Sequence, residues 1–138
     1  MKKKYLLEEI TSIKPNFQQW QIIFLFWDLW AWKTTLTKYF INQLLWVKEN
    51  IISPTYTYYN QYNWILDWEE INIYHFDLYK LSNYDEFFAI WAEEIFDNND
   101  WIIIVEWPEI IKNVYQANIV ITIEKTKNDN ERLIEILN

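Results

Sequence analysis

The stretch Trp27-Asp28-Leu29-Trp30-Ala31-Trp32-Lys33-Thr34-Thr35 lies between an apolar run, Ile22–Phe26, and a run with helical periodicity, Thr34–Leu45. Tryptophan occupies its first, fourth and sixth positions. With glycine in place of those three tryptophans, the stretch reads G-D-L-G-A-G-K-T-T. A buried strand, a loop and a helix in this order form a unit around which an α/β fold can be built.

Glycine at these positions would complete G-x-x-x-x-G-K-[ST], the Walker A phosphate loop, and every other position already fits. Such a loop wraps backbone N–H groups around an anion, which requires close backbone approach and positive φ. Tryptophan would strain that backbone and place an indole where a phosphate belongs. The written sequence therefore conflicts with its own motif.

The composition offers an explanation for this conflict. The chain has ten tryptophans and no glycine in 138 residues, whereas average usage predicts roughly ten glycines. Further tryptophans also stand where glycine is favoured: Trp46 after a helical run, Asn63-Trp64 and Asp100-Trp101 at expected turns, and Trp20 before the first strand. We infer that most of them are glycines in the living protein. Its source would read the codon UGA as glycine, whereas the written sequence translates UGA as tryptophan. UGG codons at positions 27, 30 and 32 would contradict this inference.

Length and charge narrow the class of protein. Residues 1–138 suit a single domain with a real core. A net charge of −8 argues against unaided binding to nucleic acid or anionic membranes. No cysteine is present, so a disulfide framework is excluded. The longest apolar run, Ile22–Trp27, is too short to span a bilayer. We expect a soluble cytoplasmic domain.

The hydrophobic pattern predicts an α/β fold, a three-layer sandwich with a mainly parallel central sheet like that of P-loop NTPases. Two fully apolar runs are typical of strands buried on both faces. Strands are expected at 22–26, 102–105, 119–123 and 132–137, and at 56–65 and 70–78 with a connection through Asn63 and the acidic segment 67–70; helices are expected at 34–45, 84–96 and 108–113, while 5–10 fits a strand or a short helix.

The residues at the end of the loop carry the expected phosphate chemistry. The ammonium of Lys33 would reach the β- and γ-phosphates, although a solvated lysine is the alternative. The hydroxyl of Thr34 would bind Mg²⁺, although it could be an ordinary helix N-cap. Backbone N–H groups from Trp30 to Thr35 would hold the phosphates at the helix N-terminus.

Two acids end apolar runs. Glu106 follows residues 102–105, and ligands of open α/β folds bind outside the carboxyl ends of strands. It would hold Mg²⁺ or orient an attacking water, unless it is a solvated strand end. Asp77 is a second candidate near the metal, or else the cap of the following turn. His75 is the only histidine and is expected to be structural. Ser53–Thr57 fits a loop that senses the γ-phosphate and equally a simple turn into a strand.

Four segments together resemble the TsaE family of small bacterial ATPases, formerly called YjeE. The family carries G-D-L-G-A-G-K-T-T, S-P-T-Y-T, H-F-D-L-Y-R and (I/V)-E-W-P-E. The corresponding segments here are Trp27–Thr35, Ser53–Thr57, His75–Lys80 and Val105–Glu109. Trp107 matches the family's own tryptophan, so we expect it to be genuine.

The resemblance implies an ATPase that works with the TsaB and TsaD proteins to complete threonylcarbamoyladenosine at position 37 of tRNA. ATP and Mg²⁺ would be its ligands, and tRNA would be held mainly by the partners. Lys33 and Thr34 carry over as phosphate and Mg²⁺ ligands, and Glu106 as the acid on the metal side. Asp77 carries over as a further acid, and Thr55 as a contact to the nucleotide.

The sequence departs from the family pattern at several positions, and two other functions remain as alternatives. Lys80 replaces the family's arginine and cannot form its bidentate fork, and Trp91 and Trp101 fall where relatives usually have glycine. A small-molecule kinase on the same loop would need lid arginines, but Arg132 is the only arginine. If the tryptophans are real, the chain is a non-catalytic scaffold. Trp68 lies in a variable stretch of the family.

Overall fold

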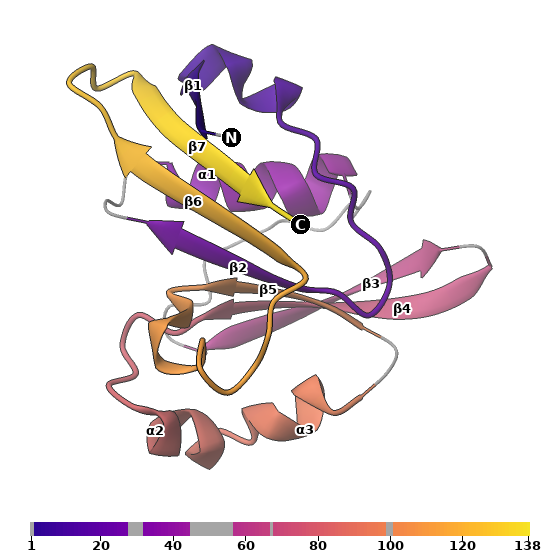
Figure 1. Ribbon diagram of the computed structural model, residues 1–138. Coiled ribbons are helices and arrows are strands. Elements are labelled where there is room, and N and C mark those ends of the chain that lie inside the picture. The colour runs from indigo at the N-terminus through magenta and orange to yellow at the C-terminus, as the bar shows by residue number, and fades with distance from the viewer. Residues whose placement is uncertain (1, 28–31, 45–56, 67, 99–100) are drawn as a thin grey trace.

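A computed structural model describes residues 2–27, 32–44, 57–66, 68–98 and 101–138. Within these residues, seven strands form one sheet in the order β1-β7-β6-β2-β5-β4-β3 (Figure 1). The strands are β1 (Lys2–Leu6), β2 (Ile22–Trp27), β3 (Tyr59–Leu66), β4 (Glu69–Asp77), β5 (Trp101–Glu106), β6 (Ile119–Lys125) and β7 (Glu131–Leu137). The helices are α1 (Lys33–Tyr39), α2 (Tyr84–Ala89) and α3 (Ala92–Phe96), with 3-10 turns η1 (Leu7–Ser12) and η3 (Pro108–Ile110) and a π-helical turn η2 (Phe40–Leu44).

The four central strands are parallel. β2 pairs in parallel with β5 and with β6, and β5 pairs in parallel with β4. The outer pairs β1–β7, β6–β7 and β3–β4 are antiparallel. This arrangement confirms the predicted α/β sheet with a parallel centre. Its consequence is that the carboxyl ends of β2, β4, β5 and β6 meet at one edge of the sheet.

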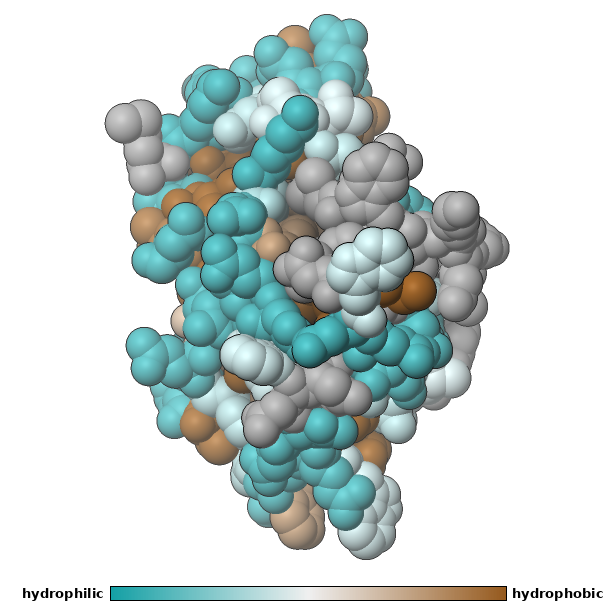
Figure 2. Space-filling model, turned by 90° about the vertical axis from the view of Figure 1, so that its right-hand side faces the viewer, coloured by the Kyte–Doolittle hydropathy of each residue, from teal (hydrophilic) through white to brown (hydrophobic). Residues whose placement is uncertain are grey.

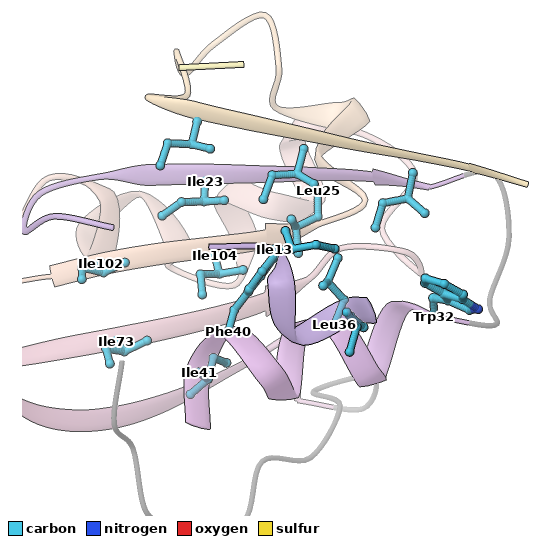
Figure 3. Close-up of a cluster of buried hydrophobic side chains, with 14 of the residues drawn as sticks. Ile13, Ile23, Leu25, Trp32, Leu36, Phe40, Ile41, Ile73, Ile102 and Ile104 are labelled. Carbon is cyan, nitrogen blue, oxygen red and sulfur yellow. The ribbon is translucent and has the colours of Figure 1, made fainter. Parts of the chain in front are cut away.

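Two apolar cores cover the two faces of the sheet. Alternate residues of β2 point to opposite faces, so Ile23 and Leu25 meet Leu36 and Phe40 from α1 and η2 (Figure 3). On the opposite face, Phe24 and its neighbours pack against α2 and α3 around Phe87. The predicted three-layer sandwich follows directly from these two helical layers (Figure 1).

The β3–β4 hairpin confirms one of the two predicted connections and contradicts the other. The chain turns in the predicted acidic segment, at Trp68, whose φ of 70° is in the left-handed region. Asn63 and Trp64, also expected at a turn, lie inside β3 and pair with Asn72 and Ile71. The prediction at Asn63 is wrong because it treated Asn63-Trp64 like Asn-Gly, the pair that favours a hairpin turn. The N-terminal segment, left open between strand and helix, forms both: β1 and then η1.

Left-handed backbone coincides with tryptophan. Five described residues have positive φ, and four of them are tryptophans: Trp20 (65°), Trp68, Trp91 (63°) and Trp107 (57°), with Tyr58 the exception. Positive φ is a strained conformation for bulky residues and an easy one for glycine. The side chains at positions 20, 68 and 91 are 59%, 99% and 73% exposed, so packing does not offset that strain. These three positions fit glycine better than tryptophan.

The buried tryptophans behave differently. Trp27, Trp32 and Trp101 are all buried, and none has the positive φ that we expected at phosphate-loop glycines. Trp27 and Trp32 therefore avoid the backbone strain that we predict for tryptophan in a phosphate-loop conformation, and both residues belong to the core. The indole N–H groups of Trp27 and Trp101 are nevertheless buried without a hydrogen-bond partner among the described residues, which is costly.

The coloured part of one face of the molecule is mainly polar. Figure 2 views the molecule from the side of the β3–β4 hairpin, and hydrophobic residues form only small separated areas among the coloured residues. Within the described residues, no helix has the length and apolar character needed to cross a membrane.

Candidate functional site

The candidate site is centred on the carboxyl ends of the parallel strands. Glu106 is the last residue of β5, and it pairs with Asp77 at the end of β4 and with Leu25 near the end of β2. The alternation of side chains places Glu106, Asp77 and His75 on the face covered by α1, because their neighbours Val105 and Phe76 belong to the opposite core. The sheet thus brings together both acids that the sequence predicted.

Glu106 is buried, with only 1% of its surface exposed. Its Oε1 accepts a hydrogen bond of 2.8 Å from the hydroxyl of Thr37 in α1, and Thr37 is itself fully buried. The alternative of a solvated strand end is therefore wrong. A carboxylate out of contact with water needs hydrogen-bond donors or a cation to offset its desolvation. The hydroxyl of Thr37 is one such donor for Glu106.

His75 lies on the other side of this carboxylate. Its Nε2 is 3.3 Å from Oε2 of Glu106, and both side chains are buried. This contact is an ion-pair distance without hydrogen-bond geometry, and both ring nitrogens are without a hydrogen-bond partner among the described residues. A buried imidazole in this condition is unusual, because unpaired buried polar atoms are destabilising.

Asp77 has an observed structural role. Its Oδ1 accepts a hydrogen bond of 3.1 Å from the backbone N–H of Tyr79, which is the turn-capping contact offered as the alternative to a metal-side role. The residue is 2% exposed. Backbone bonds from Asp77 N–H to Tyr58 O and from Leu78 N–H to Glu106 O fix both strand ends. Asp77 therefore holds the edge of the sheet in shape beside Glu106.

The predicted phosphate loop is only partly described. Asp28, Leu29, Trp30, Ala31 and Thr55 lie outside the described residues. Lys33 and Thr34 form the first turn of α1, but the description does not extend to their side chains.

Two tryptophans flank residues 28–31, and Thr35 follows in α1. Trp27 closes β2 and Trp32 precedes α1, and both indoles are buried, with Trp32 beside the first turn of α1 (Figure 3). Thr35 is exposed. The strand that precedes the motif and the helix that follows it are both present.

The sequence pattern does not predict the contacts that Thr37 and Arg132 make near the site. Thr37 was read as part of a helix, yet it binds Glu106; a hydroxyl three residues after Thr34 was the only available signal. Arg132 was noted merely as the only arginine. It is buried in β7, with its guanidinium 5.0 Å from the ring centre of Trp32, and its Nη1 donates to the carbonyl oxygens of Asp129 and Glu131.

The donor chemistry of this edge fits Mg²⁺. Carboxylate and hydroxyl oxygens are the ligands that Mg²⁺ takes, usually from one or two side chains together with substrate phosphates and water. Glu106 supplies a buried carboxylate, and Thr34 supplies a hydroxyl-bearing residue in the first turn of the adjacent helix. Among the described residues there is no cluster of three or more His, Cys, Asp or Glu suited to a metal held by protein alone.

A phosphate chain fits only if the loop carries glycine. At positions 27 and 32 the structure has buried indoles, and a Cβ with a bulky ring prevents the close backbone approach that phosphate binding requires.

Comparisons with known proteins agree with the motif order. The family model described as threonylcarbamoyl adenosine biosynthesis protein TsaE matches residues 3–134. The tRNA threonylcarbamoyladenosine biosynthesis protein TsaE of Rickettsia prowazekii is 32% identical over 91% of this chain and 80% of its own length. The protein of the same name from Haemophilus influenzae is 35% identical over 91% of this chain and 75% of its own length.

A solved structure agrees as well. The crystal structure of Bacillus subtilis YdiB matches with a TM-score of 0.62 and 26% identity, and the match covers 97% of this chain and 82% of that one. The four sequence motifs, the parallel centre of the sheet and the buried acid at its edge are consistent with these matches. The chain belongs to the TsaE family of threonylcarbamoyl adenosine biosynthesis proteins.

Proposed function

We propose that this chain is the Mg²⁺-dependent ATP-hydrolysing subunit of the cytoplasmic machinery that makes N6-threonylcarbamoyladenosine at position 37 of tRNA, acting with TsaB and TsaD proteins. The observation that carries the proposal is Glu106, a buried acid at the end of β5 and adjacent to the strand that leads into the phosphate loop. Membership of the TsaE family indicates the pathway, which is threonylcarbamoyl adenosine biosynthesis.

The proposal assigns a role to each group at the edge of the sheet. Lys33 binds the β- and γ-phosphates, and Thr34 and Glu106 hold Mg²⁺ directly or through water. The bound Mg²⁺ would neutralise negative charge on the phosphates during hydrolysis. Asp77 fixes the neighbouring strand end through its bond to Tyr79 N–H. The net charge of −8 suits a subunit that leaves tRNA to its partners.

The proposal depends on glycine in the phosphate loop. The left-handed backbone at positions 20, 68 and 91 supports the idea that tryptophan is written where the living protein has glycine. With glycine, the loop can bring its N–H groups close to the phosphates. Trp107 is a different case: we expect it to be a genuine tryptophan, because its ring centre lies 5.1 Å from that of Tyr79.

A comparison of two proteins tests the proposal. One carries tryptophan at positions 27, 30 and 32, and the other carries glycine at those three positions. We expect Mg·ATP binding by the glycine protein, measured by titration calorimetry, and ATP hydrolysis that increases when TsaB and TsaD are added. Lys33→Ala in the glycine protein should lower hydrolysis by about 10²-fold or more, as loss of a group that stabilises transition-state charge does.

A non-catalytic scaffold is the second candidate. The burial of Trp27 and Trp32 favours it if both tryptophans are genuine, because their indoles would then belong to the hydrophobic core at positions where phosphate binding requires glycine. The same titration separates the two functions. Tight Mg·ATP binding by the tryptophan protein would contradict our steric argument, whereas absence of binding by the glycine protein would contradict the ATPase proposal.

A further inference from the structure

Glu106 lies between a side chain of α1 and a side chain of β4 that have no role in the proposed function. On one side Thr37 of α1 donates to Oε1 at 2.8 Å, and on the other side His75 of β4 approaches Oε2 at 3.3 Å. All three side chains are at most 3% exposed. The contacts join residues that are far apart in sequence, so the folded structure alone brings them together.

The contact from Thr37 links the acid to the helix that follows the phosphate loop. Thr37 comes three residues after Thr34 in α1, and one helical turn contains 3.6 residues. Leu36 and Phe40, both fully buried, anchor this part of the helix in the core. The bond from Thr37 therefore fixes the end of β5 relative to the first turn of α1, where the proposed Mg²⁺ ligand Thr34 lies.

The contact from His75 is incomplete in this structure. Nε2 lies 3.3 Å from Oε2 of Glu106 without forming a hydrogen bond, and neither ring nitrogen has a hydrogen-bond partner among the described residues. Hydrogen bonds at catalytic sites are often long or misaligned without substrate and shorten when it binds. An imidazole whose Nε2 lies this close to a buried carboxylate is suited to such a change.

We propose that Thr37 and His75 are positioning residues for Glu106: Thr37 orients one carboxylate oxygen permanently, and the Nε2–H of His75 completes its bond to the other oxygen when Mg·ATP binds. The inference rests on the proposed function of Glu106. Neither residue touches the nucleotide or the metal in this scheme. Partners that orient a metal-binding side chain typically contribute 10–100-fold to metal affinity or activity.

Matched substitutions test the positioning role in the full-length protein with glycine at positions 27, 30 and 32, assayed with TsaB and TsaD. Thr37→Val removes the hydroxyl and keeps the shape, whereas Thr37→Ser restores the donor. His75→Phe removes the ring nitrogens, whereas His75→Gln places an amide donor near Nε2. Thr122→Val, a partly exposed position in β6, controls for the general effect of losing a threonine hydroxyl.

The readout is the Mg²⁺ concentration for half-maximal hydrolysis, together with kcat and with ATP affinity measured in EDTA. We expect Thr37→Val and His75→Phe to raise the Mg²⁺ requirement or lower kcat by about 10–100-fold. ATP affinity without Mg²⁺ should stay unchanged, and the Ser, Gln and Thr122 variants should remain close to wild type. A purely structural role would instead lower the melting temperature and change all parameters together, and this result would overturn the inference.

A spectroscopic test does not depend on these variants folding. His75 is the only histidine, so its imidazole NMR signals need no assignment. We expect a protected, downfield Nε2–H proton to appear when Mg²⁺ and a non-hydrolysable ATP analogue are added. Unchanged imidazole signals on binding would overturn the inference while leaving the ATPase proposal intact. If the wild-type glycine protein binds no Mg·ATP, the proposed function fails and the inference fails with it.

Discussion

Replacement of Trp68 by glycine should stabilise the chain that carries tryptophan at this position. Trp68 has a φ of 70° and its side chain is 99% exposed, so the substitution removes no buried contact. A left-handed conformation costs a residue with a Cβ about 1–2 kcal/mol. Glycine gives back about 0.4–1 kcal/mol because it makes the unfolded chain more flexible. The net gain in the free energy of unfolding is therefore about 0.5–1 kcal/mol.

Thermal unfolding followed by circular dichroism measures this gain. For a chain of this length, the net gain corresponds to a rise in Tm of about 2–4 °C. Trp68→Ala is the matched control, because alanine removes the same indole and keeps the strained φ. Its Tm should stay close to that of the parent. If glycine lowers the Tm, or if alanine raises it as much as glycine does, backbone strain at position 68 is not the cause and the reasoning is refuted.

Three further outcomes follow from packing and charge. Trp107→Gly should lower stability by about 1 kcal/mol despite a φ of 57°, because the ring contact with Tyr79 at 5.1 Å and partial burial are lost; an increase in Tm would contradict a genuine tryptophan here. Phe87→Ala should cost about 3–5 kcal/mol in urea unfolding, since Phe87 is fully buried and packs against Phe96 at 5.5 Å; a loss below 1 kcal/mol would contradict its central place in that core. Burial, with smaller contributions from Glu93 and Asp97, raises the pKa of Tyr115 to about 12, so its neutral form favours folding and this contribution is lost as the pH rises from 10 to 12. Absorbance at 295 nm should accordingly show a tyrosinate phase near pH 12 that disappears in Tyr115→Phe; the same high-pH phase in that variant would contradict the assignment.

The centre of the sheet could be predicted because its strands are fully apolar. Ile22–Phe26 and Ile102–Val105 read as strands buried on both faces, and both lie in the parallel centre. The phosphate-loop spacing also placed a helix directly after the first of them. The local sequence is sufficient to predict such strands, because a strand buried on both faces is apolar at every position.

The hairpin turn could be predicted only in part, and the contacts to Glu106 could not be predicted. The turn at Trp68 lies in the acidic segment 67–70, as expected, but Asn63 gave a second and false turn signal inside β3. The bond between Thr37 and Glu106 joins residues 69 positions apart, and no local pattern encodes such a distance. Asp77 was placed correctly at a strand end, but its bond to the N–H of Tyr79 depends on backbone geometry.

The proposed ATPase function depends most on the identity of residues 27, 30 and 32. Peptide mass spectrometry of the protein isolated from its own source, covering residues 20–46, measures it directly. We predict glycine at all three positions, which would give the strand and helix around them a working phosphate loop beside Glu106. Tryptophan at those positions would contradict the proposed function and leave a TsaE-family fold without a phosphate site.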